Sequence, residues 1–123
     1  MDRERIAHVF YVEDQRATLD GIRELLELDG HSVVAQARSV SQASEIIPKL
    51  PPKTNIAILD GDLGDGTGND VIVLLKNSGW EHLFTIGFAG DHQYVNQASV
   101  VIEKPNADGL LAAIEVALLQ ISP

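Results

Sequence analysis

Five short apolar runs, rich in β-branched and aromatic residues, alternate along the chain with segments that have the spacing of amphipathic helices. Connections of this length between consecutive strands fit only parallel crossovers. The sequence therefore predicts an α/β fold, in which a five-stranded parallel sheet carries helices on both faces. The predicted strands are residues 9–12, 31–37, 55–59, 83–89 and 99–102.

Capping residues mark the ends of several predicted helices. Gly30 is a suitable stop for a helix over 16–29, and Asn106 is a favourable N-cap for the last helix. Ser39 and Gln42 have the spacing of a capping box at the start of the second helix. The fourth crossover, 91–98, has room for only about two helical turns.

Composition limits the function. We expect the 123 residues to form a single domain over 1–123 without an attached second domain, and the absence of cysteine excludes disulfides and thiol chemistry. The formal net charge of −9 argues against a nucleic-acid partner, because phosphate binding needs an excess of lysine and arginine. No apolar run approaches the roughly 20 residues that span a bilayer, and the first residues lack a secretion signal. We therefore expect a cytoplasmic protein that binds neither a membrane nor nucleic acid.

Charged residues follow three of the predicted strands. Glu13 and Asp14 end the first strand, Asp60 ends the third, and Lys104 follows the fifth. Because the carboxyl ends of parallel strands meet at one edge of an open sheet, we expect these side chains to lie close together. Simpler interpretations exist for each: Asp60 as a turn former, the acidic pair as a helix cap, and Lys104 as a solvated charge.

Three carboxylates at one edge repel one another, and a divalent cation relieves this repulsion more readily than protonation does at neutral pH. Mg²⁺ suits the set, because one or two carboxylates hold it and its other positions take water and phosphate oxygens. Asp60 would then attack a phosphorus atom and form an aspartyl phosphate, while Lys104 neutralises the transferred oxygens.

The residues also follow a known order. An acidic pair is followed by Asp60 after an apolar strand, by Gly68 eight positions later, and by Lys104 directly before Pro105. This pattern resembles the receiver domain of two-component response regulators over essentially the whole chain. The resemblance implies a flavodoxin-like (βα)5 fold with strand order 2-1-3-4-5.

The resemblance implies a role for each matched residue. Asp60 would be the phosphoacceptor and Lys104 the phosphoryl-binding residue. The metal ligands would be Glu13, Asp14, Asp60 and the backbone carbonyl of Asp62. A sensor histidine kinase or a histidine phosphotransfer protein would supply the phosphoryl group, and a downstream protein would receive the signal. The chain would not be an enzyme beyond self-catalysed phosphotransfer and autodephosphorylation, and it would be a monomer or weak homodimer.

Two switch positions depart from the family pattern. Receiver domains usually carry threonine or serine at the end of the fourth strand and an aromatic residue three positions before the lysine, where this chain has Phe88 and Val101. Shifting the alignment by one or two residues would bring Thr85 nearer the site, but it would leave the fourth strand too short. We therefore expect segment 90–98 to respond to phosphorylation through backbone donors.

Two alternative functions remain open. Without the switch residues, the chain would act as a pseudo-receiver that docks partners independently of phosphorylation. Asp60-Gly61-Asp62 also matches the D-x-D of haloacid dehalogenase phosphatases, but the following Gly-Thr is missing and the chain is short for that family. Loop 61–70 fits neither a calcium loop, because the third acid and the bidentate glutamate are absent, nor a Gly-Lys-Ser/Thr phosphate loop. The four histidines show no ligand spacing, and we expect them at the surface or at sheet edges.

Overall fold

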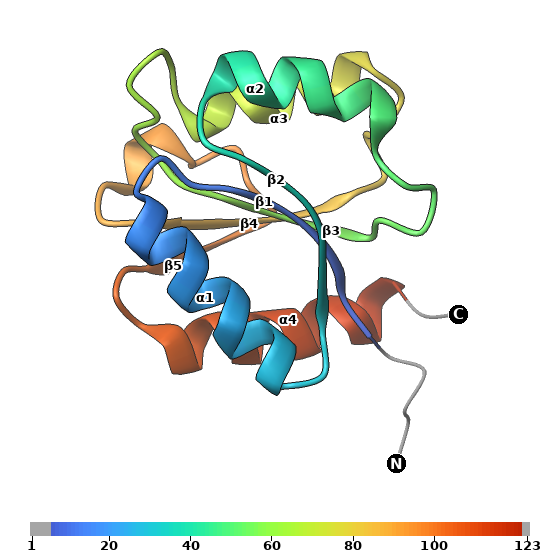
Figure 1. Cartoon of the computed structure of the whole chain (residues 1–123), viewed down its shortest axis with the longest axis vertical. Helices are drawn as coiled ribbons and strands as arrows, with labels where there is room; N and C mark the ends of the chain where they lie inside the picture. The colour runs from blue at the N-terminus through green and yellow to red at the C-terminus, as the bar shows by residue number, and fades with distance from the viewer. Residues whose placement is uncertain (1–5, 122–123) are drawn as a thin grey trace.

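The computed structural model describes residues 6–121 and contains the predicted five-stranded sheet. The strands lie in the order β2-β1-β3-β4-β5, and every neighbouring pair is parallel (Figure 1). Each predicted strand is confirmed to within one residue at either end. The strands are β1 (His8–Val12), β2 (Ser32–Ala37), β3 (Ile56–Leu59), β4 (Phe84–Ala89) and β5 (Val100–Glu103).

Four α-helices cover the two faces of the sheet. On one face lie α1 (Arg16–Leu28) and α4 (Ala107–Ile121), and on the other lie α2 (Val40–Ile46) and α3 (Gly68–Asn77) (Figure 1). A short 3-10 turn, η1 (Ile47–Lys49), extends α2. Within residues 6–121, no helix is long and apolar enough to cross a membrane.

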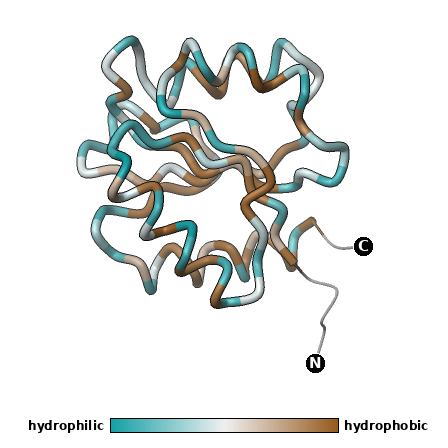
Figure 2. The backbone as a smooth tube through the Cα atoms, in the orientation of Figure 1, coloured by the Kyte–Doolittle hydropathy of each residue, from teal (hydrophilic) through white to brown (hydrophobic). Residues whose placement is uncertain are grey.

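The central strand β3 is buried on both faces. Ile56 and Ile58 pack toward α1 and α4, whereas Ala57 and Leu59 pack toward α2 and α3. Figure 2 shows hydrophobic stretches gathered in the strands between the helical layers. Full burial of each large aliphatic side chain contributes roughly 1.5–3 kcal/mol. This packing fixes β3, and the alternation of side chains directs Asp60 to the α1 and α4 side.

The predicted helix ends are largely confirmed. Gly30 follows α1 with a φ of 90°, a left-handed conformation that favours glycine, and the side chain of Asn106 caps α4. Ser39 Oγ accepts the Gln42 N–H at 3.0 Å. The Gln42 side chain, however, accepts from the N–H of Arg38 and not from that of Ser39, so only half of the predicted capping box forms.

The fourth crossover departs from the regular strand and helix alternation. It contains a single 3-10 turn, η2 (His92–Tyr94), in place of an α-helix. Val95 follows this turn, is fully buried, and packs against two glycines: a Cβ added at Gly68 or Gly87 would lie 2.4 or 2.7 Å from its methyl groups. Asn69 of α3 fastens the segment through three hydrogen bonds to residues 93–97. The short segment is therefore held in place by the burial of Val95 and by its hydrogen bonds to Asn69.

Candidate functional site

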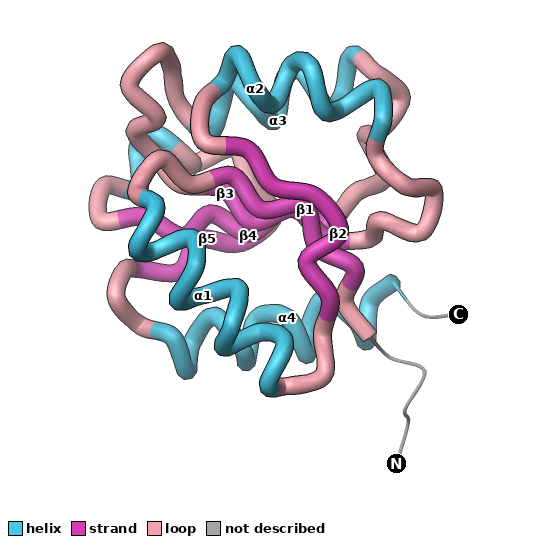
Figure 3. Tube along the Cα trace, viewed as in Figure 1, coloured by secondary structure: helices cyan, strands magenta, loops and turns pink. Residues whose placement is uncertain are grey.

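The charged residues predicted for the sheet edge lie together there. Figure 3 shows the loops that follow β1, β3 and β5 on the same side of the molecule. Asp60 N–H donates to the carbonyl oxygen of Val12 at 2.9 Å, which places the end of β3 beside the end of β1. Lys104 N–H donates to the carbonyl oxygen of Ala89 at 3.2 Å, which carries the lysine to the same edge.

One ammonium group joins two carboxylates in this cluster. Lys104 Nζ donates to Glu13 Oε1 at 2.7 Å and to Asp60 Oδ1 at 2.9 Å. Asp60 Oδ1 also accepts the N–H of Gly61 at 2.8 Å. The Glu13 side chain is fully buried and that of Asp60 is 10% exposed, so the carboxylates are largely shielded from water, whereas Lys104 is 23% exposed.

The surroundings at this edge of the sheet disfavour the ionised forms of the Asp60 and Asp14 carboxyl groups. Burial raises the pKa of Asp60, and the charge of Glu13 adds to the effect, despite the hydrogen bond from Lys104. Burial also raises the pKa of Asp14, and the nearby Asp60 carboxylate raises it further. Burial opposes the charged form of Lys104, but its bonds to Glu13 and Asp60 outweigh this cost and raise the pKa of the lysine. The edge therefore favours an additional positive charge.

The donor set fits a hard divalent cation. Glu13, Asp14 and Asp60 each offer a carboxylate oxygen, and these oxygens lie within 4.8 Å of one another. Asp14 is the most exposed of the three and leaves the group open to solvent. Carboxylate oxygens with room for water are the ligands that Mg²⁺ prefers.

The other acids nearby stabilise local structure. The Asp65 carboxylate accepts the N–H groups of Val40 and Ser41, both at 2.9 Å, and these bonds at the start of α2 lower the pKa of Asp65. Asp70 forms a capping box with Thr67 at the start of α3. Neither acid contributes a carboxylate to the edge cluster.

Asp62 was predicted to bind metal through its carbonyl oxygen. Its carboxylate accepts the N–H of Gly64 at 3.0 Å and closes the turn after Asp60. Asp62 also pairs with Thr67 in an isolated antiparallel bridge. The side chain is therefore engaged in the turn, and the role of the carbonyl stays a prediction.

The two switch positions carry apolar side chains in the structure as well. Phe88 is buried, and its ring centroid lies 5.8 Å from Lys104 Nζ, a cation–π distance. Val101 is partly buried against the cluster under α2 and α3. Thr85 exchanges hydrogen bonds with Ser99 along the sheet, so its hydroxyl is held by that partner.

Tyr11 is a neighbour of the site that sequence reasoning missed. It is fully buried in β1, and its hydroxyl lies 3.5 Å from Glu13 Oε1. Burial raises the pKa of Tyr11 far above its usual range, and the charges of Glu13 and Asp60 add to the shift. An aromatic residue within an apolar strand gives no signal beyond packing, so only the fold reveals this contact.

A second group of ligand-type side chains lies between the α1–β2 turn and α4. His31 Nε2 is 3.5 Å from Asp29 Oδ2 and 3.6 Å from Glu115 Oε2. His31 is buried directly before the edge strand β2, in line with the expected sheet-edge position, and its Nδ1 accepts the N–H of Ala7 at 3.1 Å. Nε2 has no hydrogen-bond partner among residues 6–121, so the two carboxylates approach the ring without a hydrogen bond to it.

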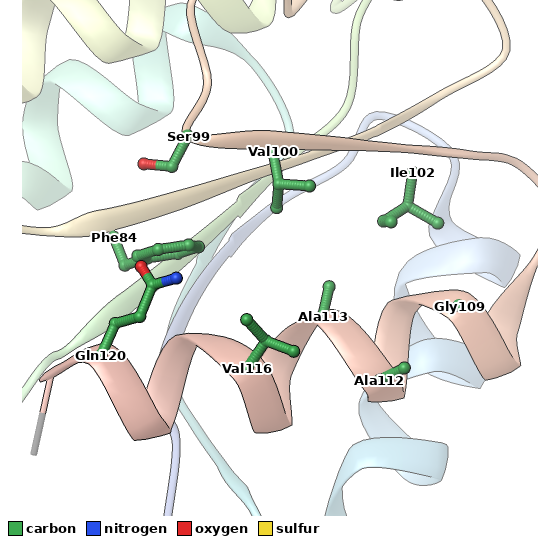
Figure 4. A pocket seen from close by; sticks show the side chains of 9 residues that line it. All are labelled: Phe84, Ser99, Val100, Ile102, Gly109, Ala112, Ala113, Val116 and Gln120. Carbon is green, nitrogen blue, oxygen red and sulfur yellow. The ribbon is translucent and has the colours of Figure 1, made fainter.

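An apolar groove lies away from the acidic edge. A groove of about 700 Å³ separates β5 from α4, and Figure 4 shows Val100 and Ile102 pointing across it toward Ala113 and Val116. No ionisable side chain lines it. The full lining is Phe84, Ser99, Val100, Ile102, Gly109, Ala112, Ala113, Val116 and Gln120.

Comparison with solved structures identifies the fold. A response regulator receiver domain from Clostridium thermocellum superposes with a TM-score of 0.80 at 24% identity, covering 94% of this chain and 96% of that chain. A CheY-like receiver domain from Methanospirillum hungatei gives 0.79 at 23% identity, with 94% and 95% covered. No protein-family model and no curated protein matches the chain. The chain therefore has the fold of response regulator receiver domains.

Proposed function

We propose that this chain is a response regulator receiver that accepts a phosphoryl group on Asp60 from a phosphohistidine of a sensor kinase or histidine phosphotransfer protein. One observation supports this most strongly: within a receiver fold, the ammonium of Lys104 contacts Asp60 Oδ1 beside two further carboxylates. A carboxylate, a fixed ammonium and a cation-binding acid set are what phosphoryl transfer to aspartate requires.

The reaction follows from the contacts of Asp60. Oδ1 already accepts hydrogen bonds from Gly61 and Lys104, which leaves Oδ2 to attack phosphorus. The bond from Oδ2 to phosphorus forms as the bond from phosphorus to the donor imidazole nitrogen breaks. The donor ring carries a proton on its other nitrogen, so it leaves as neutral imidazole. Lys104 neutralises charge on the transferred oxygens.

Mg²⁺ completes the site in this proposal. Glu13, Asp14, Asp60 and the carbonyl of Asp62 would hold the ion. Bound there, the ion supplies positive charge to the phosphoryl oxygens. The raised pKa values of Asp14 and Asp60 support this assignment, because a cation relieves the repulsion that burial intensifies.

A small-molecule phosphodonor tests the proposal. Incubation with phosphoramidate and Mg²⁺ is expected to add the mass of one phosphate to the wild type and nothing to Asp60→Asn, as measured by intact-protein mass spectrometry. A wild type that stays unmodified while a known receiver is labelled in the same tube would overturn the proposal.

Phe88 favours one alternative, a pseudo-receiver that docks partners without phosphorylation. The buried ring occupies the place of the usual hydroxyl and offers no hydrogen bond to a phosphoryl oxygen. This alternative predicts that Asp60→Asn binds its partners as the wild type does. A phosphodonor-dependent change in partner binding that Asp60→Asn abolishes would exclude it.

Segment 90–98 is the element that we propose to respond to the phosphoryl group. Gly68 lies between Asp60 and Val95: a Cβ added at Gly68 would lie 2.4 Å from both the Asp60 carbonyl oxygen and a Val95 methyl group. The segment therefore packs directly against the loop that follows Asp60. We expect its amide hydrogen exchange to change when beryllofluoride, a phosphoryl mimic, binds with Mg²⁺. Equal exchange in the two states would overturn this relay.

A further inference from the structure

His31 places a buried ring nitrogen between two carboxylates, far from the acidic edge in the sequence. Its side chain is 3% exposed, and within residues 6–121 its Nε2 has no hydrogen-bond partner. Asp29 Oδ2 lies 3.5 Å from Nε2 and Glu115 Oε2 lies 3.6 Å from it, and both acids are exposed. A buried polar atom without a partner is costly, so two acceptors beside it that form no hydrogen bond need an explanation.

The fold holds the imidazole ring in one place. His31 N–H donates to the carbonyl oxygen of Leu26 at 2.9 Å, where α1 ends, and His31 Nδ1 accepts the N–H of Ala7 at 3.1 Å, just before β1. Asp29 is the C-cap residue of α1, whereas Glu115 belongs to α4. The group therefore joins the end of α1 to α4 on one face of the sheet.

The spacing of the three side chains matches that of ligands around one metal ion. Nitrogen and oxygen ligands at 2.0–2.2 Å from a tetrahedral Zn²⁺ lie about 3.3–3.6 Å from one another. The two distances from Nε2 fall in this range, and all three ligand atoms lie within 4.8 Å of one another. Because both carboxylates are exposed, their side chains are free to rotate onto an ion that the fixed ring holds.

We propose that His31 Nε2, Asp29 and Glu115 bind Zn²⁺, with water as the fourth ligand, and that the ion fastens α1 to α4. An imidazole ligand favours zinc over Mg²⁺, whereas the edge cluster of Glu13, Asp14 and Asp60 offers only carboxylate oxygens. The two acidic groups thus select different cations. This zinc site does not depend on phosphorylation of Asp60.

Zinc binding at this site changes the contact of His31 with Ala7. A neutral imidazole has one ring lone pair, and Nδ1 uses it to accept the Ala7 N–H, so the ring proton belongs on Nε2. When Zn²⁺ takes the place of that proton, the neutral ring carries its proton on Nδ1. Two donors then face each other, and the hydrogen bond from Ala7 is lost. Coordination by three ligands outweighs the loss of one hydrogen bond.

Titration calorimetry with ZnCl₂ in excess Mg²⁺ tests the ligands. The wild type is expected to bind one Zn²⁺. His31→Gln and Glu115→Gln should weaken binding by at least the roughly 10- to 100-fold that follows loss of an outer partner of a metal ligand. Glu115→Gln changes an exposed side chain, so it tests the site even if His31→Gln fails to fold. Glu24→Gln and His92→Gln, which change an exposed acid and an exposed histidine outside the group, are the matched controls and should bind as the wild type does.

The amide signal of Ala7 gives a second measurement on the wild type. Zn²⁺ should shift this signal and quicken its hydrogen exchange, whereas Mg²⁺ alone should do neither. The proposal is overturned if the wild type binds no Zn²⁺ or if Glu115→Gln binds it as tightly as the wild type does. Zinc that binds without changing the Ala7 amide, or that excess Mg²⁺ displaces, would lie elsewhere and would overturn it as well.

Discussion

Two acid-rich regions lie next to each other in this molecule and behave in opposite ways. At the sheet edge, burial raises the pKa of Asp60, whereas in loop 61–70 backbone N–H groups lower the pKa of Asp65. The two aspartates are five positions apart, but one faces carboxylates and a lysine and the other faces the start of α2. The comparison shows that the partners of an acid, and not the density of acids, set the direction of its pKa shift.

Removing the lysine should have the largest effect on stability. In metal-free buffer, Lys104→Met leaves Glu13 and Asp60 buried without their cation and is expected to cost about 2–4 kcal/mol, below the full value of about 3–5 because Lys104 is partly exposed. Urea unfolding measures the change. Exposed Lys49→Met is the control and should stay within about 0.5 kcal/mol. Equal effects would contradict the buried ion-pair account.

Gly68 lies where the two regions meet. Gly68→Ala brings a Cβ to 2.4 Å from the Asp60 carbonyl oxygen and a Val95 methyl group, and it should destabilise the fold by about 1–3 kcal/mol. Gly21→Ala in α1 meets nothing within 4 Å and should stabilise it by roughly 0.5–1 kcal/mol. Thermal unfolding of the two variants checks the prediction. A Gly68→Ala variant as stable as the wild type would show that the loop around Gly68 shifts to make room for the added Cβ.

Asp60→Asn should remove the free-energy cost of burying the charge of Asp60, because asparagine is uncharged. A raised pKa means that the folded state binds more protons than the unfolded state as pH rises from the ordinary aspartate pKa to the raised value, so stability falls across that window. Without metal, Asp60→Asn should therefore be more stable than the wild type at neutral pH, and the difference should vanish in acid. Urea unfolding over a pH series tests this, and Mg²⁺ should narrow the gap. An Asp60→Asn variant less stable than the wild type at neutral pH would contradict the predicted upward shift of the Asp60 pKa.

Asp65→Asn should show the opposite pH dependence and the smallest effect. Its lowered pKa means that the carboxylate stabilises the fold above the ordinary aspartate pKa, and that this contribution is lost as pH falls through the folded pKa. Amide exchange at Val40 and Ser41 should quicken in the variant, while phosphorylation of Asp60 should not change. Unaltered exchange would mean that the two hydrogen bonds contribute nothing.

Local patterns were sufficient to predict the sheet and the gathering of charges at its edge. All strands of a parallel sheet end at the same edge, so the residues that follow them, Glu13, Asp60 and Lys104, are brought to that edge. Two contacts could not be predicted in this way: the hydrogen bond from the Val40 N–H to Asp65, and the approach of the Tyr11 hydroxyl to Glu13. Both join residues that only tertiary packing brings together. The single 3-10 turn of the fourth crossover depends likewise on Val95 packing against glycines far away in the sequence.

Trapping the acyl phosphate tests the central claim most directly. After reaction with phosphoramidate and Mg²⁺, borohydride reduces an aspartyl phosphate to homoserine, which peptide mass spectrometry locates in the chain. The account predicts homoserine at position 60 and none in segment 61–70, although that segment, which ends in the first turn of α3, holds three aspartates. Homoserine at Asp62 or Asp65, or none anywhere while a known receiver is trapped under the same conditions, would contradict it.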